Sequence, residues 1–234
     1  GTSVPLPGVG TLVINSDGSW TFTPALNFAG TVPVITYTLA DNPVDGNDGT
    51  DTATLTVTLI PVNDAPTAIN DVITTPEDTP VSANVLTNDS DIEGDVLSVT
   101  GFKIDGTTYP AGTTATIPGK GTMVINADGT YTFTPATDFN GTVPTVEYTI
   151  SDGNGGTATG MLNITLTPVN DNPVAVEDKL TTSEDLPLSD NVLPNDSDVD
   201  GNTLSVTQFS VAGQTYAAGS TATITGVGTL TMNV

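Results

Sequence analysis

The 234-residue chain contains no cysteine, no histidine and no arginine, and it has only three lysines. Without cysteine and histidine it has no disulfide, no Cys or His nucleophile or base, and no usual zinc site. Its 27 acidic residues give a formal net charge of −24. Because phosphate groups are bound by basic side chains, this charge excludes nucleic acid and anionic membrane surfaces as natural partners. Like charges at this density repel one another, and bound divalent cations would relieve the repulsion.

Long apolar stretches are also missing. No segment approaches the roughly 18 apolar residues that a membrane-spanning helix needs, so we expect no membrane insertion. Proline and glycine interrupt the segments longer than about ten residues, and none shows a convincing helical period. Residues 159–167 instead alternate between apolar and polar, with Leu162, Ile164 and Leu166 predicted to face a core. We therefore predict an all-β fold.

Four further segments have a strand pattern, namely residues 96–102, 121–125, 130–134 and 143–150. Asp-Gly pairs at 17–18, 105–106 and 128–129 are typical of hairpin turns. Roughly seven short strands within about 107 residues predict a β-sandwich. We expect the aromatic side chains to belong to its core or sheets and not to a sugar-binding surface; these are Trp20, Tyr131, Phe133, Phe139 and Tyr148.

Two segments of the chain recur, and both do so at the same spacing. Pro61–Pro66 returns as Pro168–Pro173, and Asn84–Asp89 returns as Asn191–Asp196. We therefore divide the chain into the C-terminal part of a first repeat (1–66), a complete repeat (67–173) and the N-terminal part of a further repeat (174–234). Each Pro-Val-Asn-Asp-x-Pro segment predicts a short, stiff joint between two repeats.

The two outer parts are complementary, because the first contains the later strands of a repeat and the last contains the earlier ones. We therefore expect that the end of one molecule can complete the start of another, head to tail. Gly8–Thr11 returns as Gly119–Thr122, at a spacing that is longer by four positions. This difference is explained by an insertion within residues 41–51, at a loop tip.

A short acidic stretch occurs twice, as residues 89–95 (DSDIEGD) and 196–202 (DSDVDGN). Carboxylates at alternating positions repel one another unless a cation lies between them, and they supply the oxygen ligands that calcium prefers. The spacing matches only the first half of an EF-hand loop, because Thr100 and Thr207 stand where its bidentate glutamate would be. A solvated acidic turn is the alternative, since Asp, Asn, Ser and Gly also form turns.

Several of these motifs resemble those of cadherin domains. Pro168–Pro173 resembles the cadherin interdomain linker, residues 148–156 resemble the Asp-x-Gly loop before the last strand, Asp89–Asp91 resembles the Asp-x-Asp motif, and Pro76–Asp78 resembles the Pro-Glu motif. Together they make the whole chain similar to bacterial cadherin-like tandem repeats, of the VCBS or extender type found in giant secreted RTX adhesins. The resemblance implies tandem Ig-like or cadherin-like β-sandwiches joined by short calcium-binding linkers.

The resemblance also implies which residues hold Ca²⁺ at each joint. The joint before the complete repeat would use Asn63, Asp64, Asp89, Asp91 and Asp152. The joint after it would use Glu77, Asp78, Asn170, Asp171, Asp196 and Asp198. Asp138 stands where cadherins have an acidic residue in their Asp-x-Glu motif, although Asn27 holds this place in the first repeat.

These features predict a calcium-stiffened extender of a large adhesin on the bacterial surface, outside the cell, that supports adhesion and biofilm formation. Its partners would be the neighbouring repeats of the same chain. The alternative is a sandwich module that binds a glycan or a peptide, for which the 41–51 insertion is the clearest candidate surface. We do not expect an enzyme, because the main carboxylate candidates recur from repeat to repeat and none is marked as a buried acid.

Overall fold

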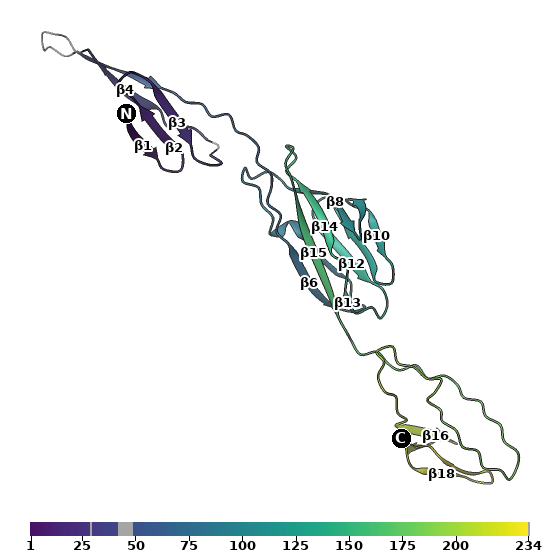
Figure 1. Ribbon diagram of the computed structural model, residues 1–234. Coiled ribbons are helices and arrows are strands. Elements are labelled where there is room, and N and C mark those ends of the chain that lie inside the picture. Colours follow the sequence, from purple (N-terminus) through teal and green to yellow (C-terminus); the bar gives the residue numbers. More distant parts are fainter. Residues whose placement is uncertain (29, 42–48, 234) are drawn as a thin grey trace. The chain divides into compact units, whose positions relative to one another are not determined.

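Nineteen β-strands and one 3-10 helix, η1 (Val85–Thr87), form the regular structure of the part of the chain that is described. The computed structural model describes residues 1–28, 30–41 and 49–233 (Figure 1). Contacts divide the chain into two units, Gly1–Thr167 and Pro168–Val234. Within the described ranges there is no helix with the length and apolar character needed to cross a membrane. The all-β fold predicted from the sequence is confirmed.

Residues 67–167 form two sheets that face each other (Figure 1). One sheet is antiparallel and contains, in spatial order, β10 (Thr114–Ile117), β11 (Gly121–Ile125), β12 (Thr130–Pro135) and β7 (Val81–Asn84). The other contains β13 (Gly141–Thr142), β15 (Thr157–Thr167), β14 (Val146–Ser151), β8 (Ser98–Ile104) and β9 (Thr107–Pro110). β6 (Asp71–Pro76) runs parallel to the end of β15, from Leu162 to Thr167.

The core of this sandwich lies between the two sheets. Leu162, Ile164 and Leu166 of β15 are buried as the alternation predicted, while Thr167 is exposed. They pack in one cluster with side chains from both sheets, among them Phe102, Met123, Phe133, Tyr148 and Ile150. Each fully buried side chain of this size contributes about 1.5–3 kcal/mol of transfer free energy, so the cluster is the main source of the sandwich's stability.

The structure contains ten strands in this repeat, β6 to β15, where the sequence predicted roughly seven. The additional strands are short or lie at sheet edges. β7, β9 and β10 have four residues each, and β13 has two. Strands of this length show too few alternations to be recognised from a pattern, and β6 is placed by its parallel pairing with a strand about 90 residues away.

Residues 1–60 repeat the later part of this arrangement. β1 (Thr2–Leu6), β2 (Gly10–Ile14) and β3 (Trp20–Pro24) form a three-stranded antiparallel sheet that corresponds to β10, β11 and β12. β4 (Ile35–Ala40) and β5 (Thr50–Leu55) pair as β14 and β15 do. Residues 42–48, which make up most of the expected 41–51 insertion, lie outside the described residues.

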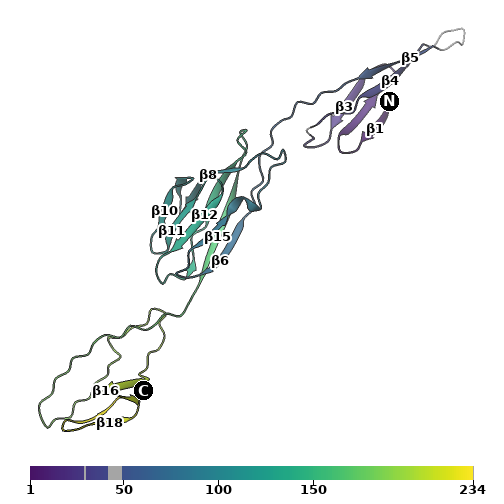
Figure 2. The ribbon, with the colours of Figure 1, turned by 180° about the vertical axis from the view of Figure 1, so that it is seen from behind.

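The second unit repeats the earlier part. It contains the hairpin of β16 (Gln208–Val211) and β17 (Gln214–Ala217) and the hairpin of β18 (Thr221–Ile224) and β19 (Gly228–Thr231), which correspond to β8–β9 and β10–β11. Phe209 stacks on Tyr216 with ring centroids 5.4 Å apart, as Phe102 stacks on Tyr109. Residues 174–207, which include the counterparts of β6 and β7, contain no strand, and Figure 2 shows this stretch as open loops before β16.

Candidate functional site

The acidic loop of residues 91–95 folds around the carboxylate of its first residue. Asp91 Oδ1 accepts hydrogen bonds from the backbone N–H groups of Glu93 (3.0 Å) and Asp95 (3.2 Å). Gly94 has a φ of 80°, which glycine adopts without the strain that a Cβ would cause. The second oxygen, Asp91 Oδ2, is buried and has no hydrogen-bond partner among the described residues. The loop therefore presents one carboxylate oxygen that the described protein groups leave unsatisfied.

The linker that precedes the complete repeat is hydrogen-bonded to this loop. The backbone N–H of Asp64 donates to Glu93 Oε2 at 3.3 Å. Thr67 and Ser90 exchange two backbone hydrogen bonds of 2.7 and 3.0 Å. Together these bonds hold residues 64–67 against the acidic loop of the sandwich that follows.

A second loop completes this end of the sandwich. Asp152 is only 4 % exposed, and its Oδ1 accepts the backbone N–H groups of Asn154 (2.7 Å) and Gly156 (3.0 Å). Its Oδ2 accepts a 2.7 Å hydrogen bond from Asn63 Nδ2, which is the main reason that the pKa of Asp152 is lowered. A Cβ on Gly156 would collide with the Asp152 carboxylate and the Ala65 backbone, so the close approach of loop and linker requires glycine there.

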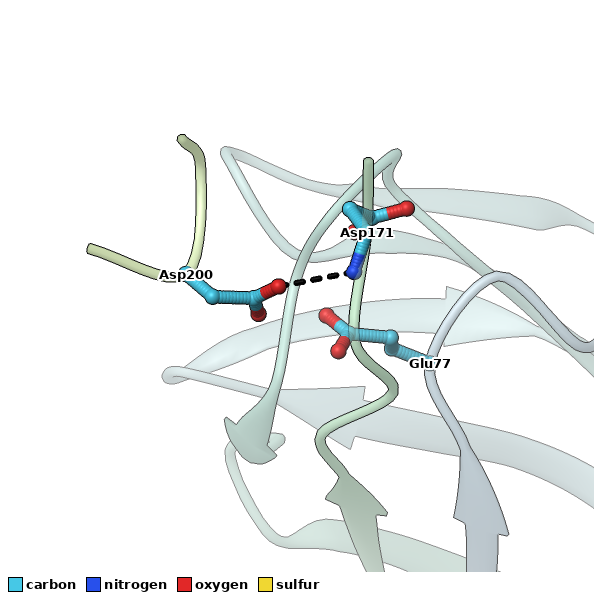
Figure 3. Close-up of side chains that lie close together, drawn as sticks. All are labelled: Glu77, Asp171 and Asp200. Atoms are coloured by element: carbon cyan, nitrogen blue, oxygen red, sulfur yellow. Dashed lines mark hydrogen bonds between the residues drawn. The ribbon is translucent and has the colours of Figure 1, made fainter. Parts of the chain in front are cut away.

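The same linker-and-loop arrangement recurs in residues 168–234. Asp171 N donates to Asp200 Oδ2 at 2.7 Å, as Figure 3 shows, and these two residues are the counterparts of Asp64 and Glu93 in the next repeat. Asp198 Oδ1 accepts the N–H groups of Asp200 (3.1 Å) and Asn202 (3.2 Å). The two backbone bonds also recur, between Val174 and Ser197. The hydrogen bond from the linker to the acidic loop is thus retained, although Glu93 of one repeat is replaced by Asp200 in the next.

Asp89, the first residue of the acidic stretch, points to a different place. Its Oδ1 accepts the backbone N–H of Ile69 at 2.8 Å, and Asp196 does the same for Val176. Nearby, the Tyr148 hydroxyl donates to Asp71 Oδ2 at 2.8 Å and lies 3.0 Å from Ile69 O. Burial is the largest cause that raises the pKa values of Asp71, Asp89 and Tyr148. Asp89 and Asp196 therefore hold the residues that follow each linker in place through these hydrogen bonds.

The opposite end of the sandwich carries another acidic group. Glu77 follows β6, is only 2 % exposed, donates its backbone N–H to Thr167 O (3.0 Å) and accepts a hydrogen bond from Asn140 Nδ2 (3.3 Å). Asp138 N donates to Asp78 Oδ1 at 3.0 Å, and one carboxylate oxygen of Asp78 lies within 4.8 Å of one from Asp138. Both aspartates have positive φ, 56° and 58°. These residues lie at the end of β15 from which the next linker leaves.

Ten of the twelve predicted ligands therefore fall into three groups, and the other two, Asp89 and Asp196, lie apart from them. Hydrogen bonds connect the ligands at the first linker into one network and those at the second linker into another, whereas those after β6 take part in two separate bonds. The members of the three groups are Asn63, Asp64, Asp91 and Asp152; Asn170, Asp171 and Asp198; and Glu77, Asp78 and Asp138. Asp89 and Asp196 are equivalent residues of two repeats, and each accepts a backbone N–H from the chain after its own linker, as described above. Sequence reasoning did not select Glu93, Asp95 and Asp200 as ligands, although all three stand in the acidic stretches.

Two-sheet sandwiches of this topology, repeated along a chain and linked through acidic loops, define the class of tandem Ig-like modules. The chain belongs to the bacterial Ig domain family, whose model matches residues 63–165 and 170–234. A cadherin-like domain model matches residues 2–60. The similarity to bacterial cadherin-like repeats expected from the motifs is thereby confirmed. Such domains are typically non-catalytic adhesion-type modules found outside the cell, and cadherin-like domains generally bind calcium.

Solved structures that match the chain include protocadherin gamma B7 extracellular cadherin domains 1–4, with 17 % identity and a TM-score of 0.44 over 80 % of this chain and 46 % of that one. Protocadherin gamma B2 domains 1–5 share 16 % identity at a TM-score of 0.43, over 77 % and 35 % of the two chains. An endo-fucoidan hydrolase of glycoside hydrolase family 107 shares 21 % identity at 0.30, over 74 % and 25 %. The chain thus spans a quarter to a half of these proteins. No curated protein sequence matches it.

Proposed function

We propose that this chain is a segment of a calcium-stiffened stalk in a large secreted bacterial surface adhesin of the RTX type, where it supports adhesion and biofilm formation. The observation that carries the proposal is the recurrence, from one repeat to the next, of a linker hydrogen-bonded to an acidic loop. A joint that is repeated in the same form suits a mechanical element, in which each module performs the same task. A catalytic site has no comparable reason to be copied from module to module.

The first joint offers a set of oxygen ligands that suits calcium. A buried carboxylate oxygen without a partner costs about 1–3 kcal/mol or more, and Asp91 Oδ2 is such an oxygen among the described residues. A divalent cation bound to Asp91 would remove this cost. Calcium takes about six to eight oxygen ligands, and Asn63, Asp64, Glu93 and Asp152 bring further oxygens into the same network.

The next joint has matching ligands on both sides of its linker. Asn170, Asp171, Asp198 and Asp200 repeat the first set, while Glu77, Asp78 and Asp138 stand at the end of the preceding sandwich. Glu77 N is bonded to Thr167 O, and Asp171 follows Thr167 by four residues. Four extended residues span at most about 14 Å, and we propose that carboxylates of both sets bind cations at this joint.

A cation at each joint would turn separate sandwiches into a stiff series. Interfaces between consecutive domains are small and mobile by default, and the prolines of the linkers restrict only part of that motion. Carboxylates from two modules that bind one ion fix the angle between them. Calcium is scarce inside cells and abundant outside, so the stalk would become stiff once it is exported. Sites in extracellular modules have dissociation constants of roughly 0.1–1 mM, which suits such a response.

Thermal unfolding with and without calcium tests the proposal. With a dissociation constant near 1 mM, 10 mM calcium should raise the Tm of a bridged module by about 5–10 °C over the value in EDTA. Asp91→Asn should lose most of this shift, because it removes a charged ligand. Asp105→Asn is the matched control, since Asp105 lies in a hairpin turn of the same sandwich. A wild-type Tm that is the same in calcium and in EDTA would contradict the proposal.

Small-angle X-ray scattering tests the mechanical part separately. The wild-type chain in calcium should give a larger and more sharply defined maximum dimension than in EDTA, at the same molecular mass. Asp91→Asn together with Asp198→Asn should show the EDTA behaviour even in calcium. Calcium binding without any change of the scattering curve would leave a metalloprotein but remove the stiffening role.

A further inference from the structure

We infer that the complete repeat carries a binding site for a neutral saccharide, in a hollow on the outer face of its larger sheet. The hollow lies over β8, β9 and β14, and its volume of about 460 Å³ is within the range of about 300–1,000 Å³ that is usual for ligand pockets. None of the predicted calcium ligands, all of which are described, lines it. The site is therefore separate from the joints and from their proposed stiffening.

Strand pairing places the lining side chains in two rows across these three strands. In the order β14, β8, β9, the first row contains Glu147, Lys103 and Thr108, and the second contains Thr149, Gly101 and Pro110. Side chains two residues apart on a strand point to the same face. Both rows therefore lie on the solvent face of the sheet, while Phe102 and Tyr148 between them point into the core and are buried.

Gly101 stands at the centre of the second row, so no side chain fills the middle of this face. A Cβ here would come within 2.8 Å of the backbone oxygen of Tyr109, so the close approach of β9 to β8 requires glycine. A register shift beside Gly101 leaves Thr100 with no residue opposite it on β14, and the Thr100 hydroxyl donates to Thr149 O at 3.3 Å. Such bulges re-aim side chains and are over-represented next to active sites.

The first row contains an ion pair that is not hydrogen-bonded. Lys103 Nζ is 4.0 Å from Glu147 Oε1, which is too long for a hydrogen bond, and the two side chains are 47 % and 39 % exposed. The other two lysines, Lys120 and Lys179, have oxygen partners at 3.0 and 2.9 Å. Neither Lys103 nor Glu147 has a side-chain hydrogen bond to the rest of the described chain. Donor N–H groups and acceptor oxygens are thus available side by side for a ligand.

This pair of groups matches two neighbouring hydroxyls of a sugar ring. One hydroxyl can accept from Lys103 while the next donates to Glu147, because every hydroxyl is both donor and acceptor. The hydroxyls of Thr108 and Thr149 have no partner within the described ranges and can bond further ring substituents. The exposed Pro110 ring offers an apolar contact for the C–H groups of the sugar. A net charge of −24 repels anions, so the expected ligand is neutral.

The fold itself does not require these side chains, because the corresponding strands of the other repeats hold different residues. The counterparts of Gly101, Lys103 and Glu147 are Gln208, Ser210 and Thr36. Partly exposed ion pairs also contribute little to stability. The glycine and the two charges are therefore particular to the complete repeat, which suits recognition by this module and not a task shared by every module.

NMR titration of the ¹⁵N-labelled 234-residue chain tests the site. The probes are methyl α-glucoside, methyl α-mannoside and methyl β-galactoside, because together they present cis and trans pairs of neighbouring hydroxyls. At least one should shift the amide signals of residues 100–103, 108–109 and 147–149 and saturate with a dissociation constant of about 1–10 mM. No saturable shift with any of the three would overturn the inference, and so would saturation confined to other residues.

Substitutions taken from the other repeats separate recognition from folding. Lys103→Ser and Glu147→Thr should each weaken binding about tenfold and leave the amide spectrum outside the hollow unchanged, since both side chains are partly exposed. Lys179→Ser with Glu177→Thr removes an ion pair outside the hollow and is the matched control, which should bind as the wild type does. Undiminished binding by both hollow variants would overturn the inference. Binding of glycylglycine but of no glycoside would also overturn it, because the site would then recognise a zwitterion.

Discussion

Trp20 and Tyr131 occupy the same position in two successive repeats, yet Trp20 is 47 % exposed and Tyr131 is 3 % exposed. Each is paired with an isoleucine of the neighbouring strand, Ile14 for Trp20 and Ile125 for Tyr131. The difference in exposure arises from the elements that pack next to each side chain. β7 and η1 lie beside Tyr131, and residues 1–60 contain no counterpart of either.

Substitution of these two aromatic residues should therefore have unequal effects. Tyr131→Ala should lower the free energy of unfolding of the complete repeat by about 3–5 kcal/mol, because it leaves a cavity in a closed core. Trp20→Ala should cost about 1 kcal/mol or less in dilute solution, since half of the side chain already meets water. Urea unfolding followed by hydrogen exchange of β11 and β2 measures the two effects separately. Equal losses of unfolding free energy would show that the side chains of Tyr131 and Trp20 are equally enclosed, and would contradict this prediction.

The Tyr148 hydroxyl should contribute to stability through its hydrogen bond to Asp71. Tyr148→Phe keeps the ring in the core but leaves the Asp71 carboxylate and Ile69 O without this donor, which we expect to cost about 1–3 kcal/mol. Tyr37→Phe, at the corresponding position of residues 1–60, is the matched control and should cost less, because Tyr37 is only half-buried. Urea unfolding monitored by circular dichroism gives both values. A neutral Tyr148→Phe would show that water replaces the hydroxyl.

Asp71 and Asp128 should titrate on opposite sides of the ordinary aspartate value of 3.8. Burial is the main cause that raises the pKa of Asp71, and the Thr130 side chain, which donates to Asp128 Oδ1, is the main cause that lowers the pKa of Asp128. Carbon-detected NMR of the two carboxyl groups measures both midpoints. Tyr148→Phe should raise the pKa of Asp71 further, because the hydroxyl favours its charged form.

The two shifts have opposite consequences for stability. Folded Asp71 binds its proton more tightly than the unfolded chain does, so its contribution to stability decreases as the pH rises from 3.8 through its raised pKa. Folded Asp128 releases its proton more easily, so its contribution is present above pH 3.8 and is lost as the pH falls through its lowered pKa. Asp71→Asn should remove the first dependence and leave the second. A stability curve unchanged by Asp71→Asn would contradict this assignment.

Ala212 should be a weak point of the β16–β17 hairpin. It takes the place of Asp105 in the turn and has a φ of 49°, a region that alanine enters only with strain while glycine and asparagine tolerate it. Ala212→Gly or Ala212→Asn should therefore stabilise the hairpin by about 0.4–1 kcal/mol, read from hydrogen-exchange protection of residues 208–217. Ala218→Gly, outside the turn, should instead be neutral or destabilising. A destabilising Ala212→Asn would mean that the turn has another conformation in solution.

Much of the site could be predicted from the sequence because it consists of local patterns. The acidic stretch, with glycine at its sixth position, is wrapped by hydrogen bonds among its own residues, so Asp91 and Asp198 were recognisable without a partner. The contact between Asn63 and Asp152 joins segments far apart in the sequence, and here the resemblance to known motifs was needed. The placement of Asp89 beside Ile69 and Tyr148 had no sequence signal, because it depends on the chain turning back after the linker.

Alternation, turn residues and repetition in the sequence by themselves determined an all-β chain of repeated units, since side chains of a strand point alternately to its two faces and Asp-Gly pairs favour reversal of the chain. Only the tertiary structure decided which of these faces are closed. Burial depends on a second sheet supplied by residues far along the chain, so identical patterns are a core in residues 67–167 and a surface in residues 1–60.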